Sequence, residues 1–201
     1  MLGAPCRAGE AGRSLLELVF MVALAALVSS AGLGALRHQR AERAGREAAR
    51  LLMHELQAVA YDARLSATDM AVVLEQPDTG HATFQVLTDG NGNGVKVADV
   101  AAGIDRPVGA ARLAFAEGTA RLAIARPVPT TDHSGTLAAG SAPVRFGIAP
   151  YISFSPRRTG SSGSIHIRGP EGSQYAIRVL GSTGRLRLLC LNATAFLWEG
   201  C

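Results

Sequence analysis

The sequence has little charge and little cysteine, and each shortage excludes a class of protein. Charged residues make up only 18% of the 201 residues, against about 25% in an average globular chain. Apolar residues make up 48%, which is too many for a disordered tail. Three cysteines are too few for a disulfide-dense mini-protein or a four-cysteine zinc module. The length allows one ordinary folded core.

Lysine is almost absent, since Lys96 is the single lysine among 20 basic residues. The other basic residues are arginines, which are well suited to binding phosphate, so this bias favours a nucleic-acid partner. However, 16 acidic residues nearly balance the basic ones, and the net charge is only +4. Composition alone is therefore weak evidence for a polyanionic partner.

A long apolar run lies near the start of the sequence. Residues 15–36 contain a single charge, Glu17, and the 19 residues from 18 to 36 contain none. As a helix this run would span about 28 Å, close to the thickness of a hydrocarbon core. A buried core helix should carry a polar stripe, which residues 18–28 lack, and a cleaved secretory signal has a shorter apolar stretch. We therefore expect a retained transmembrane helix over residues 13–36.

Glu17 is unusual because a carboxylate inside a spanning helix costs about 2.5–3.5 kcal/mol on insertion scales and usually has a partner. It ends the sequence GRSLLE at residues 12–17, which follows a short polar leader. This sequence resembles the type IV prepilin signature: a leader ending in Gly, a small hydroxyl residue, two aliphatic residues, and Glu at the fifth mature position. The resemblance implies that the prepilin peptidase removes residues 1–12 by cleaving between Gly12 and Arg13.

The resemblance also implies a role for each end of this signature. In the family, the glutamate faces the free N-terminal amine of a neighbouring subunit inside a filament, so that two buried charges compensate each other. Glu17 takes this place here. The first mature residue is N-methylated in the family and is usually Phe, whereas this sequence has Arg13. Cleavage depends mainly on the glycine, so cleavage remains the expectation. Arg13 departs from the family pattern at the position that is N-methylated and that fits into the filament.

Two topology signals conflict. Five arginines lie within residues 37–50 and two within residues 7–13, so the positive-inside rule alone places the C-terminus in the cytoplasm. The prepilin resemblance implies the opposite orientation: a single-pass protein of the bacterial inner membrane with its C-terminal domain in the periplasm. We follow the resemblance.

After the apolar run, the helix is expected to continue as an amphipathic helix over residues 37–66. Apolar residues recur there at three- and four-residue steps, and no proline interrupts them. From residue 67 the pattern changes to short alternating runs separated by Gly, Asn, Pro and Ser, which predicts a β-rich domain over residues 67–201. The fold class is therefore α+β, with a long N-terminal helix packed on a mostly antiparallel sheet.

Nine strands are expected in this domain, from the runs of β-forming residues. They cover residues 70–74, 82–87, 112–115, 120–124, 144–148, 152–155, 164–168, 175–180 and 185–190. Residues 126–143 contain three prolines with many Thr, Ser and Gly, and this composition predicts a surface loop.

The second half of the sequence narrows the resemblance. ISFSPRRTGSSGSIHI at residues 152–167 and YAIRVLGSTGRLRL at residues 175–188 resemble the closing strands of the GspH/FimT group of pseudopilins. The resemblance implies a pilin-like fold and a minor pseudopilin, a structural subunit of the type II secretion pseudopilus that assembles with other pseudopilins. The alternative within the same group is a FimT-like minor pilin of a type IV pilus, with DNA as a further partner.

No catalytic motif is present, because the five histidines are scattered and the sequence lacks HExxH, G-x-S-x-G and a Walker loop. We therefore expect a protein that is not an enzyme and needs no cofactor. One exception concerns calcium: Asp89, Asn91 and Asn93, followed by Gly94, match the opening of a calcium loop, and Asp99 adds an acid. The loop lacks the acidic twelfth position, and a Gly/Asn turn between strands is the alternative.

A disulfide follows from the expected periplasmic location. Cys190 and Cys201 lie eleven residues apart, and an oxidising compartment would join them, a bond worth up to about 3 kcal/mol by loop entropy. The alternative is two free thiols.

Arg185 and Arg187 are expected on one face of a strand, about 7 Å apart, close to the spacing of successive phosphates. The Gly-Arg-x-Arg pattern resembles that of FimT-type pilins that bind DNA. Other arginines that would enlarge this basic surface are Arg157, Arg158, Arg168 and Arg178. The alternative is an ordinary solvated strand face.

Overall fold

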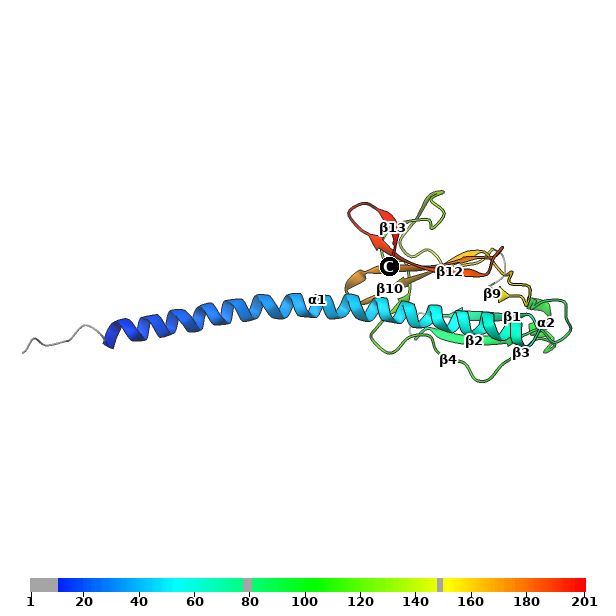
Figure 1. The fold of residues 1–201 in the computed structure, drawn as a ribbon, viewed down its shortest axis with the longest axis horizontal. Helices are drawn as coiled ribbons and strands as arrows, with labels where there is room; N and C mark the ends of the chain where they lie inside the picture. Colours follow the sequence, from blue (N-terminus) through cyan, green and yellow to red (C-terminus); the bar gives the residue numbers. More distant parts are fainter. Residues whose placement is uncertain (1–10, 78–80, 148–149) are drawn as a thin grey trace, which may run out of the picture. The chain divides into compact units, whose positions relative to one another are not determined.

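The computed structural model describes residues 11–77, 81–147 and 150–201, apart from the side chains of residues 11–14, 29–33 and 35 (Figure 1). The expected leader, residues 1–12, falls almost entirely outside the described residues. The chain divides into two compact units, residues 1–40 and 41–201.

One helix, α1 (Ala11–Leu65), covers both the expected apolar segment and its amphipathic continuation in 55 residues. It ends where the backbone leaves the helical conformation: Ala67 has a φ of 52°, and the Ser66 hydroxyl donates to the Asp62 carbonyl at 2.8 Å. No helix in the described part of the chain has the combination of length and apolar character that crossing a membrane requires.

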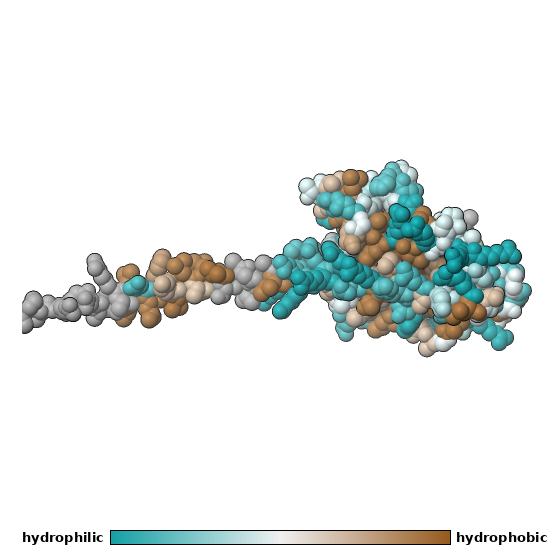
Figure 2. All heavy atoms as spheres, in the orientation of Figure 1, coloured by the Kyte–Doolittle hydropathy of each residue, from teal (hydrophilic) through white to brown (hydrophobic). Residues whose placement is uncertain are grey.

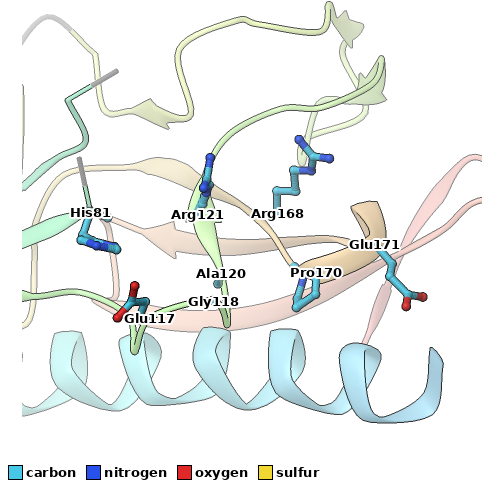
Figure 3. Close-up of a pocket in the computed structure, with 10 residues that line it drawn as sticks. His81, Glu117, Gly118, Ala120, Arg121, Arg168, Pro170 and Glu171 are labelled. Atoms are coloured by element: carbon cyan, nitrogen blue, oxygen red, sulfur yellow. The ribbon is translucent and has the colours of Figure 1, made fainter. Parts of the chain in front are cut away.

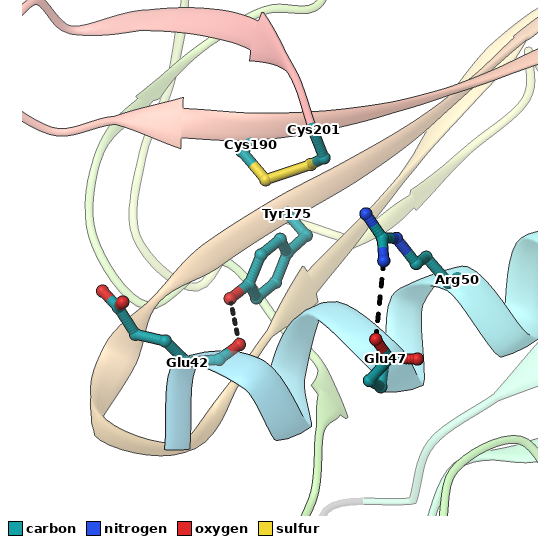
Figure 4. The surroundings of a disulfide bond; sticks show 6 residues. All are labelled: Glu42, Glu47, Arg50, Tyr175, Cys190 and Cys201. Atoms are coloured by element: carbon teal, nitrogen blue, oxygen red, sulfur yellow. Dashed lines mark hydrogen bonds and ion pairs between the residues drawn. A yellow bond between two sulfur atoms is a disulfide. The ribbon is translucent and has the colours of Figure 1, made fainter. Parts of the chain in front are cut away.

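Within residues 41–65, most of the expected apolar stripe of α1 is buried, but Leu51, which was expected to belong to it, is 63% exposed. Leu52 and Leu56 are at most 1% exposed. Gly45 marks the closest approach, because a Cβ there would lie 2.9 Å from the Tyr175 ring and 3.0 Å from the Gly169 Cα. The Tyr175 hydroxyl donates to the backbone carbonyl of Glu42 at 2.9 Å (Figure 4). This part of the helix is therefore fastened to the domain by packing and by a hydrogen bond.

The β-strands form two larger antiparallel sheets and one small hairpin. The first sheet has the order β3-β2-β1-β9, with β4 also paired to β2. Its strands are β1 (Met70–Glu75), β2 (Thr83–Thr88), β3 (Arg106–Pro107), β4 (Arg112–Leu113) and β9 (Tyr151–Phe154). A short helix, α2 (Val97–Ala101), lies in the connection from β2 to β3.

The second sheet has the order β13-β12-β11-β10-β5, with β8 also paired to β10. Its strands are β5 (Arg121–Leu122), β8 (Val144–Arg145), β10 (Gly163–Arg168), β11 (Gln174–Leu180), β12 (Arg185–Asn192) and β13 (Leu197–Gly200). A 3-10 turn, η1 (Pro170–Gly172), links β10 to β11. The hairpin pairs β6 (Val128–Pro129) with β7 (Thr136–Leu137).

Both larger sheets contribute to one main core with α1. Fully buried members include Phe84 and Ile152 from the first sheet and Ile165 and Ile177 from the second, together with Leu52 of the helix. Burying each such side chain contributes about 1.5–3 kcal/mol. The expected α+β class, with antiparallel sheets and a long helix, is confirmed.

The prediction of a plain surface loop over residues 126–143 is wrong in part. This stretch contains β6 and β7, and Val128 and Leu137 are buried in a second apolar cluster with Trp198. The indole N–H of Trp198 donates to the Pro129 carbonyl at 2.6 Å. Isolated apolar residues among Pro, Thr and Gly gave no period-2 signal, yet they cover one face of the second sheet.

Candidate functional site

The start of α1 presents apolar side chains to solvent. Between Leu15 and Val28 the described side chains are exposed, with Leu16 at 74% and Val28 at 72%. Figure 2 shows this segment in brown along the first half of the helix. A contiguous exposed apolar surface marks a site of interaction with another protein or a membrane.

The predicted assembly residues lie at the start of this surface. Gly12 and Arg13 fall in the first turn of α1, and the side chain of Arg13 is outside the described set. Glu17 is exposed, and no ion pair between described residues involves it. When this surface is covered by apolar groups, the carboxylate of Glu17 needs a partner from outside the described chain.

The two cysteines predicted to pair are bonded in the structure, with Cα atoms 5.3 Å apart (Figure 4). Cys190 lies on β12 and packs against the main core, and Cys201 directly follows β13. The bond therefore closes the hairpin of β12 and β13 at its base.

The loop predicted as a calcium site is held by its own hydrogen bonds. The Asp89 carboxylate accepts backbone N–H groups from Asn91, Gly92 and Gly94 at 3.0, 2.9 and 2.7 Å. Burial alone would raise the pKa of Asp89, but hydrogen bonds from the backbone outweigh it, so this pKa lies below its usual value. The Asn91 side chain donates to Asp99 at 3.3 Å.

Asp105 completes this loop and was missed in the sequence. It is 1% exposed, and its carboxylate accepts the backbone N–H groups of Gly90 and Lys96 at 3.0 and 2.9 Å. Among the described residues, no group of three or more His, Cys, Asp or Glu is placed to hold a metal ion. The backbone N–H of Asn93 donates to the Asn91 side chain at 3.3 Å, and calcium binding by this loop stays a prediction.

The predicted basic pair has the expected geometry. Arg185 and Arg187 are exposed on β12, while the intervening Leu186 packs against the main core. Across the sheet, Arg187 lies directly opposite Arg178 on β11. Of the other arginines predicted for this surface, Arg158 lies beside Gly184, because a Cβ on that glycine would be 3.0 Å from the Arg158 carbonyl. Arg168 is at the opposite end of β10 from the Ser164–Arg178 pair.

One buried Ser–His pair lies outside every sequence prediction. The Ser164 hydroxyl is 3.1 Å from Nε2 of His166, and the histidine is fully buried beside the Trp198 ring. Burial and then the charge of Arg145 lower the pKa of His166 to about 4. Nδ1 has no hydrogen-bond partner among the described residues. A nucleophile–base pair needs a base oriented by a third group, and the described residues supply none.

A mixed-charge cavity of about 560 Å³ lies beside β5 and the end of β10 (Figure 3). Arg121 and Arg168 are direct cross-strand partners at its wall, and His81, Glu117 and Glu171 also line it. Figure 3 shows these side chains on several separate segments. The cavity contains both signs of charge, and the described residues that line it include no hydroxyl or thiol nucleophile.

No family model, curated protein or solved structure matches the chain. What the chain does has to be inferred from its own residues.

Proposed function

We propose that the protein is a minor pseudopilin of a type II secretion system, similar to the GspH group: a structural subunit without enzymatic activity. The apolar start of α1 inserts into the bacterial inner membrane, and residues 41–201 form the periplasmic domain. The subunit then joins other pseudopilins in a short filament that serves protein secretion across the outer membrane.

The observation that carries this proposal is the exposed apolar surface of Leu15–Val28 with one carboxylate, Glu17. A stable folded chain does not leave so much apolar surface in water, so another molecule covers it. A membrane covers it before assembly, and the helices of neighbouring subunits cover it afterwards. The main core needs none of it, because that core is built from residues 48 onward.

Glu17 gives the surface its specificity. Prepilin peptidase cleavage between Gly12 and Arg13 creates a free amine at the start of the apolar segment. An amine and a carboxylate buried separately would each be costly, whereas together they offset much of that cost. A neighbouring subunit's amine is therefore the partner that Glu17 requires, and mature Arg13 is the residue that would carry the N-methyl group.

The disulfide between Cys190 and Cys201 supports the proposed location. Structural disulfides persist in oxidising compartments such as the periplasm and are rare in the bacterial cytoplasm. This bond is consistent with the orientation implied by the prepilin signature rather than with the orientation given by counting arginines.

The test is to replace Glu17 by Ala in the full-length protein and measure its co-purification with the other subunits of the filament. We expect normal membrane insertion, because the helix becomes more apolar, but loss of incorporation, because the neighbour's amine is left unpaired. Glu47→Ala is the matched control, since Glu47 is an exposed acid of the same helix outside the apolar run, paired with Arg50 at 3.5 Å. Normal incorporation of Glu17→Ala would refute the role of the carboxylate.

A FimT-like minor pilin of a type IV pilus is the second candidate. Exposure of Arg185 and Arg187 on one face of β12, with Arg178 opposite, favours it through DNA binding. The neighbouring genes distinguish the two systems: secretion ATPase and secretin genes support the pseudopilin, whereas pilus and competence genes support the pilin.

A further inference from the structure

Three arginines and one serine form a row across the second sheet. The cross-strand register places Arg145 on β8 opposite Ser164 on β10, Ser164 opposite Arg178 on β11, and Arg178 opposite Arg187 on β12. Directly paired residues place their side chains on the same face of a sheet. The row therefore lies on one face, the face opposite the core residue Ile165.

A cavity of about 310 Å³ lies over this row. Its floor includes Arg145, Ser164 and Arg178, and its wall comes from residues 130–134 of the turn between β6 and β7. The Arg178 guanidinium donates to the Thr131 carbonyl, so the same side chain that lines the cavity also holds its wall in place. Arg187 lines an adjoining cavity that shares Thr131 and Arg178.

The row contains positive charge without matching negative charge. No ion pair between described residues involves Arg145, Arg178 or Arg187. Like charges directly opposite each other destabilise a sheet, so an anion bound beside them would relieve this repulsion.

Asp132 is the one acid among the described residues that line the cavity. Its carboxylate accepts the backbone N–H and the hydroxyl of Ser134 at 3.1 and 2.7 Å. These hydrogen bonds hold the wall, and the hydroxyl of Ser134, followed by that of Thr130, lowers the pKa of Asp132. The cavity lining therefore keeps an excess of positive charge at neutral pH.

Hydroxyl groups lie beside this charge. Thr130, Ser134, Ser162 and Ser164 line the same cavity, and Ser162, which accepts the backbone N–H of Gly181 at 2.9 Å, keeps its own proton to donate. Ser164 is 7% exposed and bonds to His166, whose low pKa keeps the ring neutral above about pH 4. Guanidinium groups and hydroxyls are the groups that bind carboxylate and phosphate oxygens with directed hydrogen bonds.

We propose that the cavity lined by Arg145, Ser164 and Arg178 binds a small oxyanion, a carboxylate or a phosphate group. This site does not depend on the filament role proposed above. Its volume of about 310 Å³ is ample for such a group, and Asp132 at its wall disfavours a polyanion with closely spaced charges.

The test uses the full-length protein in a non-ionic detergent and follows binding by isothermal titration calorimetry at constant ionic strength. Inorganic phosphate and acetate are titrated separately, with chloride as the balancing anion. We expect saturable binding of one equivalent of at least one of them, and the stronger of the two names the group that the site takes. Absence of saturable binding for both anions would overturn the proposal.

Variants separate a built site from general attraction by a basic protein. Arg145→Gln should weaken binding about tenfold, as expected for loss of a charged hydrogen-bonding group. Because Arg145 is exposed on β8, this substitution should leave the fold intact. Asp132→Asn should strengthen binding severalfold. Arg106→Gln, which removes an exposed arginine from the first sheet, should leave binding unchanged.

Two outcomes would contradict the site. Equal weakening by Arg106→Gln and Arg145→Gln would show only non-specific attraction. In the second, a DNA duplex competes with the anion for binding, and this competition is abolished by Arg185→Gln with Arg187→Gln but unaffected by Arg145→Gln. That result would show that the anions bind on β12 instead.

Discussion

Two apolar stretches of α1 have opposite surroundings. Leu16 and Val28, near the start, are more than 70% exposed, whereas Leu52 and Leu56, further along, are at most 1% exposed. The second stretch is covered by the two sheets of its own domain. The first is exposed in the described chain, and under the proposed function a membrane or neighbouring subunits cover it.

This difference separates stability from assembly within one helix. Side chains of the covered stretch contribute to the free energy of unfolding of the domain, since their apolar surface leaves water when the chain folds. Under the proposed function, side chains of the exposed stretch contribute instead to insertion and to contacts with other molecules. Substitutions in the two stretches should therefore be distinguishable by separate measurements.

The largest expected effect comes from Leu52→Ala in the covered stretch. We expect a loss of about 2–5 kcal/mol in the free energy of unfolding, because the change leaves a cavity in the core. Leu16→Ala, its matched control in the exposed stretch, should change the same quantity by less than about 0.5 kcal/mol. Urea unfolding of the detergent-solubilised protein, followed by fluorescence of the single tryptophan, Trp198, measures both. Equal losses in the free energy of unfolding for Leu52→Ala and Leu16→Ala would contradict the separation of a stabilising stretch from an assembly stretch.

Acid should weaken the domain through His166. Its pKa is about 4 in the folded protein, against an ordinary value of 6.5, so below pH 6.5 the unfolded chain takes up a proton that the folded chain excludes. Stability should fall between about pH 6.5 and pH 4 by roughly 3 kcal/mol. His166→Gln should lose less over the same window, because glutamine does not titrate. Identical pH profiles for both proteins would refute the role of His166.

The disulfide between Cys190 and Cys201 should contribute to the free energy of unfolding by about as much as the His166 effect, or by less. Replacing both cysteines by Ala is expected to lower the free energy of unfolding by up to about 3 kcal/mol, because the unfolded chain gains freedom. Non-reducing peptide mapping of native protein should recover the two residues linked. Recovery of both as alkylated free thiols would show that the bond does not form in the cell.

The smallest effect on stability is expected at the basic pair. Arg185→Gln with Arg187→Gln should change the free energy of unfolding by less than about 0.5 kcal/mol, because both side chains are exposed. If the pair binds DNA, the wild-type protein should bind a duplex with a steep salt dependence, and the double variant should lose about two contacts, each worth roughly −0.9 in log–log slope.

A double variant of equal charge controls for that experiment. Arg106→Gln with Arg126→Gln removes two exposed arginines elsewhere and should leave the slope unchanged. Absence of any duplex binding by the wild-type protein at low salt would exclude the DNA-binding alternative and leave the two arginines as a solvated strand face.

Much of the fold could be predicted from the sequence, because its elements carry local patterns. The alternation of Ile165 and Ile167 with polar neighbours predicted β10, and the apolar spacing around Leu52 predicted the buried side of α1. The strand β13 was missed, because Trp198 is a lone apolar anchor in a short segment. Its partner Pro129 lies far away in the sequence.

The candidate sites divide in the same way. The signature around Glu17 and the pair Arg185 and Arg187 are continuous in sequence, so both could be located there, and their roles stay predictions. The role of Asp105 in bonding the loop of Asp89 could not, because it depends on backbone geometry across the loop. The row from Arg145 to Arg187 depends on the register of four strands, which no local pattern fixes.

The most direct test of the central claim is the start of the mature protein. Mass spectrometry of protein extracted from membranes of the native host should find a chain that begins at Arg13, because the proposed pseudopilin requires cleavage after Gly12 before Glu17 can meet a neighbour's free amine. A chain that retains Met1, or one that begins at any residue other than Arg13, would contradict the account.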